Sequence, residues 1–481
     1  MPSSFISRAT SLLLVGVSLS ACTTLTMAPD YNRPKAPIAN VLPYVDGDAN
    51  EIASLVSWRS VFSDPTLQAL IETALVNNRD LRVATLNVER ARALYRIQRA
   101  DSLPSVAASG DYSNQRFGEN ASTGIAGAPS SGSGPITIEQ FSATAGVSAY
   151  ELDLFGRVRS LNRQALETYF ATDEARKAAQ ISLVAEVAAA YLQLAADREL
   201  LALARNTFES QQASRDLTQQ LVDTGVGNNL DVQRARTSIE RARADASNLE
   251  AQVARDENAL RLLLGSAQAP EVEDAVTIAS VELQRDIPVG ISSEILLDRP
   301  DIRAAENRLK AANANIGAAR AAFFPRILLT ASAGTASAEL NDLFSGGTGV
   351  WSFAPSVSVP LFTGGRNRAQ LSSAKIDRDI AKAEYEQAIQ AAFRDIADAL
   401  ATRSTINERI NATENLADAS AKTYALAEAR FRNGVDDYLA VLDAQRADYA
   451  ARQELVGARL AEAANIIAIY RALGDGFEGA N

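Results

Sequence analysis

The sequence lacks histidine entirely and has a single cysteine, Cys22, among its 481 residues. The first absence removes the commonest general base and every catalytic triad that contains histidine. Together, the two absences remove almost every set of ligands that holds zinc or copper. We therefore expect no enzyme, no metal and no bound cofactor. A formal net charge of −11 also argues against a nucleic-acid partner, because an acidic surface repels phosphates.

Glycine and proline are absent from two long stretches, Arg157 to Thr224 and Arg366 to Asn433, each 68 residues long. Nothing inside them breaks or kinks a helix, so each stretch predicts one continuous helix. At about 1.5 Å per residue, such a helix spans roughly 100 Å, several times the width of a small domain. The sequence therefore predicts an elongated protein that is mainly helical.

The chain is an internal duplication. A shift of 209 residues superposes the glycine before each long stretch, the Gly-Val pair after it and a later Leu-Gly pair. A shift of 221 residues superposes an earlier segment that ends at Pro104 and Pro325. The difference lies in a Gly/Ser-rich insert, Gly118 to Pro135, which we interpret as a longer loop in the first copy.

The N-terminus has the features of a signal peptide. Arg8 precedes an apolar run from Leu12 to Leu19, which is too short to cross a bilayer as a mature helix. The residues Leu19-Ser20-Ala21-Cys22 then resemble the lipobox of bacterial lipoproteins. That resemblance implies cleavage before Cys22, covalent lipid on this residue and, because Thr23 follows, transfer to the outer membrane. A plain secretory signal is the alternative interpretation.

Downstream of the signal, no apolar run reaches the 18 residues of a membrane-spanning helix. Two segments, Phe141 to Ala149 and Trp351 to Leu361, instead alternate apolar and small polar residues, as strands with one apolar face do. Val106 to Ser113 and Ile327 to Thr335 alternate more weakly. Each repeat therefore predicts one hairpin, with strands of about ten residues that match the thickness of an outer membrane.

The four predicted strands cannot close a membrane barrel by themselves, since the smallest known barrels have eight. An open sheet edge in lipid would leave backbone groups without hydrogen bonds. We therefore expect several copies of the chain to share one barrel. A small soluble sandwich with one hydrated face is the alternative interpretation of these strands.

Each repeat also predicts a helix before its hairpin and a shorter helix that returns after the long one. These helices are Leu67 to Ala100, Pro300 to Ala322, Leu230 to Leu264 and Tyr438 to Leu473. Gly225 and Gly434 suit the position after a helix end where positive φ is needed. Apolar residues from Leu183 to Ala204 follow coiled-coil spacing, with Asp197 as the one polar interruption.

The patterns together divide the chain into the following segments. They are a signal peptide (1–21), a lipid-anchored N-terminal segment (22–64), a first repeat (65–265), an equatorial linker (266–298), a second repeat (299–474) and a C-terminal tail (475–481).

Several motifs are similar to those of one known family. They are Pro29-Asp30-Tyr31 with Arg33-Pro34, Trp58-Arg59 with Phe62 and Asp64-Pro65, Tyr150 to Arg157, Leu297 to Ile302, and Tyr438 to Arg446. On these motifs, and over nearly all of the mature chain, the sequence resembles the TolC-type outer-membrane efflux proteins, in the lipoprotein branch that includes OprM and NodT. The resemblance implies a homotrimer in which each chain adds four strands to a shared twelve-stranded β-barrel above a long coiled-coil helical tunnel.

The resemblance also implies a function, the exit duct of a tripartite efflux pump that exports small molecules and drugs. The implied partners are a periplasmic adaptor (membrane fusion protein), an inner-membrane transporter of the resistance-nodulation-division type and outer-membrane lipid. The only implied group besides protein is the lipid on Cys22.

Family positions carried over to this sequence imply a pore constriction at Leu439, Asp443 and Asp231. The same resemblance implies that the adaptor docks at two tip pairs, Gly225-Val226 and Gly434-Val435. The sequence departs from the TolC pattern nearby. One ring aspartate of that family falls on Ala440, and a basic gate residue falls on Asp436.

Other interpretations stay open from the sequence. The same tube would also suit a type I protein-secretion pump, and a periplasmic coiled-coil lipoprotein without a pore would share its long helices. An enzyme that works through a carboxylate pair such as Glu151 and Asp153 is a further alternative, since these two residues are two apart on a strand and so share a face. Asp443 has the alternative of a solvated helix charge, and the tip glycines have the alternative of simple helix caps.

Overall fold

The computed structural model describes residues 26–44, 57–118, 135–266, 270, 272, 276–285 and 292–473. The predicted signal peptide, Cys22 and nearly all of the Gly/Ser-rich insert lie outside the described residues. The chain forms two compact units. A sheet unit contains residues 1–34, 89–170 and 307–382, and a helical unit contains residues 35–88, 171–306 and 383–481. Both repeats supply residues to both units.

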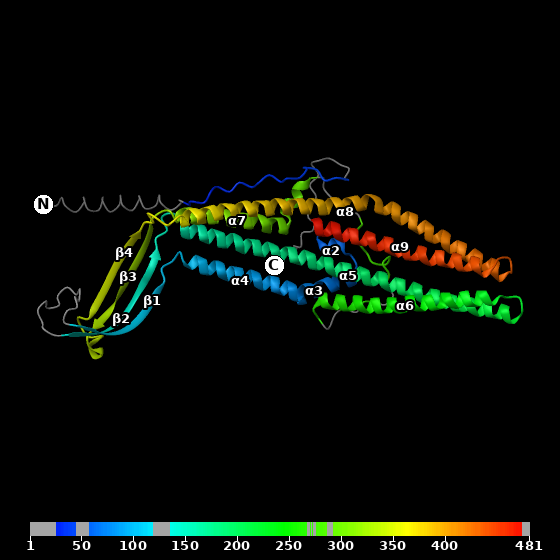
Figure 1. Ribbon diagram of the computed structural model, residues 1–481, viewed down its shortest axis with the longest axis horizontal. Helices are drawn as coiled ribbons and strands as arrows, with labels where there is room; N and C mark the ends of the chain where they lie inside the picture. Colours follow the sequence, from blue (N-terminus) through cyan, green and yellow to red (C-terminus); the bar gives the residue numbers. More distant parts are fainter. Residues whose placement is uncertain are drawn as a thin grey trace. The chain divides into compact units, whose positions relative to one another are not determined.

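The sheet unit is built on four antiparallel strands in the order β1-β2-β3-β4 (Figure 1). They are β1 (Val106–Phe117), β2 (Ile136–Glu151), β3 (Arg326–Ser337) and β4 (Gly349–Ser358), with a short helix η3 (Leu340–Asp342) between the last two. The two predicted hairpins are confirmed. The central pairing of β2 with β3 joins the first repeat to the second, which the separate hairpins did not predict.

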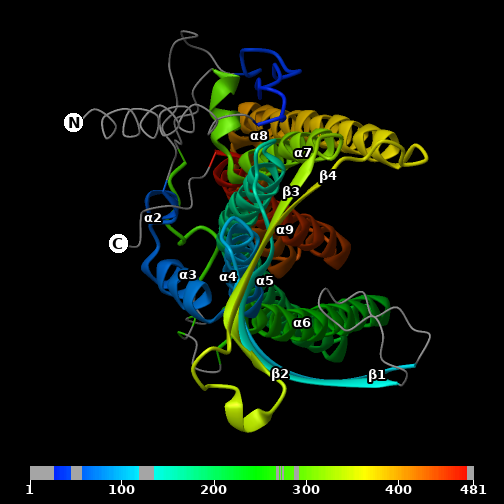
Figure 2. The same cartoon turned by 90° about the vertical axis from the view of Figure 1, so that its left-hand side faces the viewer.

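Two glycines allow the central strands to approach each other. A Cβ on Gly146 would lie 2.4 Å from the carbonyl oxygen of Ala331, and one on Gly334 would lie 2.1 Å from that of Ala143. The pairing of β2 with β3 is irregular between Val147 and Tyr150. Such irregularities bend a strand and increase its twist, and the strands are visibly curved in Figure 2.

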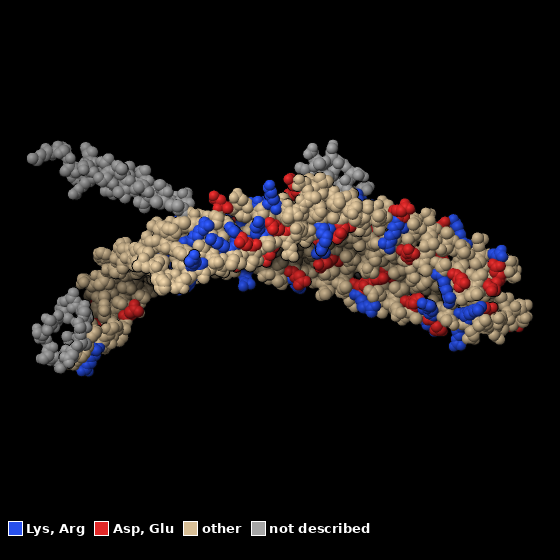
Figure 3. All heavy atoms as spheres, turned by 45° about the horizontal axis from the view of Figure 1, so that its top comes forward, with Lys and Arg blue, Asp and Glu red and all other residues tan. Residues whose placement is uncertain are grey.

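The sheet exposes large apolar side chains rather than charges. Every residue of β4 is exposed, and Trp351 keeps 79% of its surface accessible. The face of the sheet drawn in Figure 3 carries few charged side chains. The strand ends at Ser358, so Val359 and Leu361 follow it rather than belonging to it as predicted. An exposed apolar surface of this kind needs lipid or another chain to cover it.

The long helices are confirmed. They are α5 (Arg157–Asp223) and α8 (Arg366–Arg432), each of 67 residues, one residue shorter than predicted. The return helices α6 (Asn229–Leu264) and α9 (Tyr438–Leu473) have 36 residues each. The helix before the second hairpin is α7 (Pro300–Ala321). Equal lengths at a constant shift show that the duplication preserved each helix without insertion.

The helix predicted from Leu67 to Ala100 is in fact two helices, α3 (Pro65–Asn77) and α4 (Arg79–Ala100). Asn78 separates them with an extended backbone. Its side-chain oxygen accepts hydrogen bonds from the amides of Asp80 and Leu81, both at 2.9 Å, and its amide nitrogen donates to the carbonyl of Leu263 at 2.8 Å. Asparagine competes well with helical backbone bonding and caps helices, which explains the break.

The core of the helical unit lies where short elements pack on the ends of the return helices. The short elements are α2 (Trp58–Val61), α3 and a 3-10 helix η2 (Ser293–Asp298). Phe62 is fully buried, and its ring meets that of Tyr470 edge-on at 5.3 Å. Arg299 donates to the last turn of α9 through the carbonyl of Ala472 at 3.1 Å. These contacts hold the C-terminal end of α9, which lies far from the turn at Gly434.

One helix of the described part, α5, contains an 18-residue window that is apolar enough to cross a membrane by length and composition alone. Of that window, 56% is buried within the chain. The core helix of a soluble assembly has the same properties, so this window is weak evidence for a membrane span. The exposed sheet is the stronger candidate for contact with lipid.

Candidate functional site

The two turns that join a long helix to its return helix have the same backbone geometry. Gly225 and Gly434 both have positive φ, 81° and 72°. In the first turn, the amide of Gly225 donates to Val222 and that of Val226 to Leu221. In the second, the amide of Gly434 donates to Phe431 and that of Val435 to Arg430. This pair of bonds is the Schellman cap, so the predicted helix caps are confirmed.

Both turns present an apolar side chain that the chain itself does not cover. Val226 is 77% exposed and Val435 is 61% exposed. Open space surrounds the two cap glycines, since a Cβ on either would meet nothing within 4 Å. An exposed valine beside an accessible turn offers an apolar contact to a partner protein. Each turn can therefore cap its helix and also serve as a docking surface.

The second turn differs from the first by an ion pair. Arg430, near the end of α8, donates from Nη2 to Oδ1 of Asp436 at 2.8 Å and also contacts its other oxygen. The hydrogen bonds from Arg430 lower the pKa of the Asp436 carboxyl. The departure from the TolC pattern at Asp436 therefore places an acid where it pairs with an arginine of its own turn. In the first repeat, Gly227 occupies the corresponding position.

The predicted constriction residues lie in the first turns of the return helices. Leu439 and Asp443 are four residues apart on α9, so they share one face, and both are exposed in the single chain. Asp231 lies in the first turn of α6 and forms an ion pair with Arg234 at 3.2 Å. A constriction made of symmetric copies needs other chains, so the gate assignment stays a prediction.

A buried cluster packs behind the second turn. Ala235 of α6 contacts Tyr438, Val441 and Leu442 of α9, and Tyr424 and Phe431 of α8 pack against them. Burial raises the pKa of Tyr438 to about 12. The cluster lies on the opposite side of α9 from exposed Asp443, and it joins the return helices of the two repeats.

Four polar side chains join the two helical hairpins at a short distance from the tips, and the sequence analysis did not identify them. The amide of Gln211 donates to Oε1 of Gln445 at 2.7 Å, and Nε2 of Gln445 donates to Oγ of Ser210 at 3.2 Å. The hydroxyls of Ser210 and Tyr424 are 3.0 Å apart. Both glutamines are buried. Glutamine is common on solvated helix faces, so only a polar break in the coiled-coil spacing could have indicated this network.

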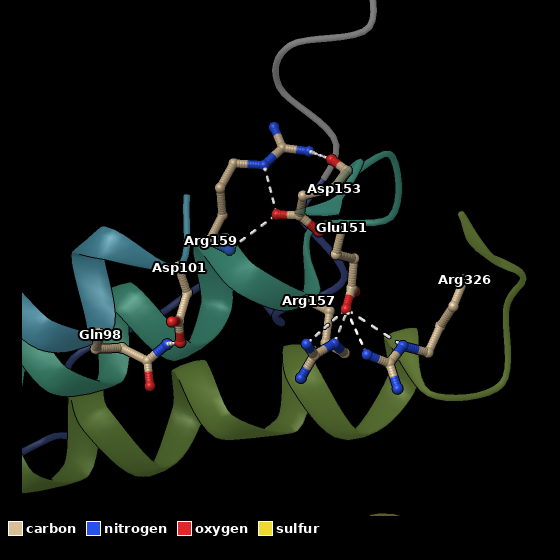
Figure 4. Close-up of polar contacts among 7 residues, drawn as sticks. All are labelled: Gln98, Asp101, Glu151, Asp153, Arg157, Arg159 and Arg326. Atoms are coloured by element: carbon tan, nitrogen blue, oxygen red, sulfur yellow. Dashed lines mark hydrogen bonds and ion pairs between the residues drawn. The ribbon is translucent and has the colours of Figure 1, made fainter. Parts of the chain in front are cut away.

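Charged side chains gather where β2 ends and α5 begins (Figure 4). Glu151 accepts two hydrogen bonds from Arg157, at 2.7 and 2.8 Å, and two from Arg326 of β3, at 2.7 and 3.2 Å. Asp153 accepts from the backbone and side chain of Arg159. The strand ends at Glu151, so the expectation that Glu151 and Asp153 share one strand is wrong. Both carboxylates thus form hydrogen bonds with arginines. These bonds connect the sheet to the start of α5.

An N-terminal strap, residues 27–31, lies on α7 within the sheet unit. Arg320 donates to the carbonyl of Met27 at 3.1 Å, Asn313 donates to that of Pro29 at 2.8 Å, and Lys310 lies over the ring of Tyr31 at 5.5 Å. A Cβ on Gly317 would lie 2.7 Å from the amide nitrogen of Ala28.

Among the described residues, no group of three or more acidic, histidine or cysteine side chains could hold a metal ion.

Comparisons with known proteins agree with this geometry. The profile of the family described as outer membrane efflux protein matches residues 70–266 and 291–475. The toluene efflux pump outer membrane protein TtgC of Pseudomonas putida is 46% identical, over 97% of this chain and 96% of that protein. The outer membrane protein OprJ of Pseudomonas aeruginosa is 42% identical, over 97% and 96%. The chain belongs to the outer membrane efflux protein family.

Solved structures of the family have the same fold. A membrane protein from Pseudomonas aeruginosa superposes with a TM-score of 0.86 at 42% identity, over 94% of this efflux protein and 98% of that chain. The open state of the MtrE outer membrane channel of Neisseria gonorrhoeae has a TM-score of 0.83 at 40% identity, over 94% and 98%. The second of these neighbours is an outer-membrane channel.

The main predictions from the sequence are therefore confirmed. The protein is mainly helical, and its four strands contribute to a trimeric barrel of the TolC type. It is an efflux duct of the outer membrane that extends into the periplasm. Its family consists of channels and not of enzymes.

Proposed function

We propose that this efflux protein is a passive exit duct for small apolar molecules and drugs, served by a proton-driven inner-membrane pump and a periplasmic adaptor. Near-full-length similarity to relatives named as toluene, solvent and antibiotic efflux pump components supports the substrate class. The similarity extends through both repeats, including the two helical turns that an adaptor would reach. The duct supplies no chemistry, and its task is to open and close.

The sheet supports a trimer as the working state. The strands β1 and β4 form the two edges of the sheet of one chain, and each presents unpaired backbone groups. In lipid these groups cost several kcal/mol each unless a neighbouring chain pairs with them. Three chains of four strands make the twelve-stranded ring that the family resemblance implies, and each β4 then pairs with the β1 of its neighbour.

The gate in this proposal is a ring of Leu439 side chains with a ring of Asp443 carboxylates one turn above it, supported by Asp231 at the first tip. Their exposure and common face on α9 agree with a role in the lumen. Symmetric carboxylates around a narrow pore attract cations and oppose each other's ionisation. The polar network of Ser210, Gln211, Tyr424 and Gln445 would hold the two hairpins together while the gate is closed.

The adaptor docks at the tips in this proposal. Val226 and Val435 supply exposed apolar contacts beside the turns at Gly225 and Gly434. A single cysteine placed at Gln219 or Glu428, near each turn, should cross-link to the adaptor, whereas simple helix caps would yield no product.

A covalent lipid on Cys22 anchors the duct in the outer membrane, and the strap on α7 fixes the chain between lipid and barrel.

The test uses bacteria that lack their own duct but keep a pump and adaptor of the same type. The wild-type chain should restore resistance to toluene and hydrophobic antibiotics, and the purified trimer should conduct ions across planar bilayers. Secretion of a protein substrate without restored resistance would instead assign the tube to a type I protein-secretion pump. A monomer that leaves bilayers silent would be the lipoprotein spacer, and it would overturn the proposal.

A further inference from the structure

Two aspartates face each other across the contact between α5 and α6 in the helical unit. Asp197 of α5 is buried, and Asp256 of α6 is partly buried. Each accepts a hydrogen bond from the glutamine four residues earlier on its own helix. Gln193 donates to Oδ2 of Asp197 and Gln252 donates to Oδ1 of Asp256, both at 2.8 Å. The same arrangement of glutamine and aspartate therefore occurs on both helices, and the ion pair between the next residues, Arg198 and Glu257 at 3.0 Å, joins the two helices at this level.

One oxygen of this pair has no donor. Oδ2 of Asp256 is buried and lacks a hydrogen-bond partner among the described residues. A buried carboxylate oxygen without a donor, beside a second carboxylate, is costly because both charges lose water and repel each other. A single proton placed between the two carboxyls removes one charge and supplies the missing donor. The arrangement therefore suits one proton rather than none.

The neighbouring charges are engaged elsewhere. On α6, Arg255 donates to Oε1 of Gln252 at 2.6 Å. On α5, Arg198 pairs with Glu257 of α6 at 3.0 Å and also donates to the carbonyl of Val272. Glu199 accepts a hydrogen bond from the amide of Ile278 at 3.1 Å. The positive groups around the pair thus already bind other partners, and of them Arg255 lowers the pKa of Asp256.

The second repeat provides an internal comparison. The shift of 209 residues that superposes α5 on α8 and α6 on α9 makes Ile406 the equivalent of Asp197 and Asn465 the equivalent of Asp256. Ile406 is buried, and Asn465 donates to the carbonyl of Ala399 at 2.8 Å. Helices of identical length thus pack in the second repeat with no acid at these two positions. The two aspartates of the first repeat are therefore not a requirement of the fold.

We propose that Asp197 and Asp256 share one proton and act as a proton-dependent clasp between α5 and α6, present in the first repeat alone. When the proton is bound, the carboxyls are joined by a strong hydrogen bond. When it leaves, two carboxylates repel each other across the same contact, and this part of the hairpin loosens. The clasp goes beyond the proposed duct function, because a duct without it would still conduct.

The direction of the pH effect follows from the protonation of Asp256. Burial, and then the hydrogen bond and charge of Asp197, raise the pKa of Asp256 from 3.8 to about 6. The folded chain therefore holds this proton more tightly than the unfolded chain does. The resulting stabilisation is complete below pH 3.8 and is lost as the pH rises through about 6. The clasp is closed in acid and weakened at neutral pH.

Hydrogen exchange of the detergent-solubilised trimer at pH 5 and pH 8 tests this proposal. The readout is the protection of peptides around Asp256 divided by that of peptides around Asn465. Because both sets experience the same change in intrinsic exchange with pH, the ratio isolates the clasp. We expect the ratio to fall by about fivefold between pH 5 and pH 8 in the wild-type chain. A constant ratio would overturn the proposal.

Two variants decide whether the aspartates cause the change. Asp256→Asn and Asp197→Asn each supply a permanent donor, so the ratio should become independent of pH. Glu240→Gln, which neutralises an exposed carboxylate on α6, is the control and should behave as wild type. A pH-dependent ratio that survives in both asparagine variants would contradict the clasp. If one variant fails to fold, the other still decides, and infrared spectroscopy should detect a protonated carboxyl at pH 5 that disappears at pH 8.

Discussion

The return helices α6 and α9 are equal in length and occupy equivalent places in the two repeats, yet they differ in burial. In α9, 17 of 36 residues are buried, including Val456, Ile466 and Tyr470. In α6, only 6 of 36 are buried, mostly alanine, leucine and isoleucine. Most of the α6 surface therefore contacts solvent or another molecule, whereas α9 is a core element of the helical unit.

The comparison shows which properties a duplication preserves. Helix length and cap geometry are the same in both copies because they depend on backbone hydrogen bonds and on one glycine at each turn. Side-chain chemistry has diverged at equivalent positions. The acid pair of the first repeat corresponds to Ile406 and Asn465, and Gly227 corresponds to Asp436. The two repeats thus share helix lengths and turn geometry, but their polar side-chain contacts differ.

The largest difference is expected from truncations at equivalent positions of the two return helices. Ile467→Ala in α9 should destabilise the chain by about 2–5 kcal/mol, because it leaves a cavity in a packed core. The equivalent Asn258→Ala in α6 should cost no more than about 0.5 kcal/mol, because Asn258 is exposed. Thermal unfolding followed by circular dichroism measures both. Equal losses would refute the assignment of α9 as the core helix.

Conductance should separate the two tips. Leu439→Ala combined with Asp443→Ala widens the predicted constriction and should increase single-channel conductance in planar bilayers by about twofold or more. The change equivalent to that of Leu439 in the first repeat, Leu230→Ala, should alter conductance much less. If Leu230→Ala acts as strongly as the double variant, or if the double variant has no effect, the gate does not lie at Leu439 and Asp443.

A double-mutant cycle measures the link between the hairpins. Gln211→Ala and Gln445→Ala should show a coupling energy of about 1 kcal/mol, because each variant alone leaves a buried amide without its partner. The exposed pair Arg205 and Glu250, which joins α5 to α6 at 2.7 Å, is the comparison. Its coupling should be at most about 0.5 kcal/mol, since water and salt screen it. A smaller coupling for the glutamines than for this ion pair would contradict their role.

The smallest effect is expected at the second turn. Arg430 lowers the pKa of Asp436, so the ion pair stabilises the turn above the ordinary pKa of 3.8 and is lost as the pH falls through the lowered value. Arg430 is exposed and Asp436 is partly exposed, so Asp436→Asn should change the unfolding temperature only slightly, and only at low salt. A large change that persists at high salt would show that the pair does more than close its own turn.

Much of the helical architecture was predictable because glycine and proline, the residues that interrupt helices, are absent from the two long stretches. Stretches without glycine or proline gave both long helices to within one residue, and alternation gave the two hairpins. The single helix predicted from Leu67 to Ala100 was wrong. Asn78 caps the second helix through local hydrogen bonds, and its side-chain amide also donates to the carbonyl of Leu263, which is far away in the chain. Local propensity cannot reveal a partner at that separation.

The candidate site was less accessible to sequence reasoning. The turn glycines were predictable from their pattern, and their caps are confirmed. The assignments of Leu439, Asp443, Asp231 and the tip pairs came from family resemblance, and they stay predictions because one chain cannot form a ring. The buried glutamines were missed, since Gln211 and Gln445 look like solvated helix residues until α5 and α9 are brought together.

The sequence by itself determined the length of each helix, the number of strands, the duplication and the family, because these follow from local backbone preferences and from motifs. Only the tertiary structure decided which equivalent positions are buried, which carboxylates are occupied by arginines and which aspartates face each other. Those properties depend on contacts between residues far apart in the chain. Two copies of one sequence pattern therefore acquire different chemistry once their side chains meet different neighbours.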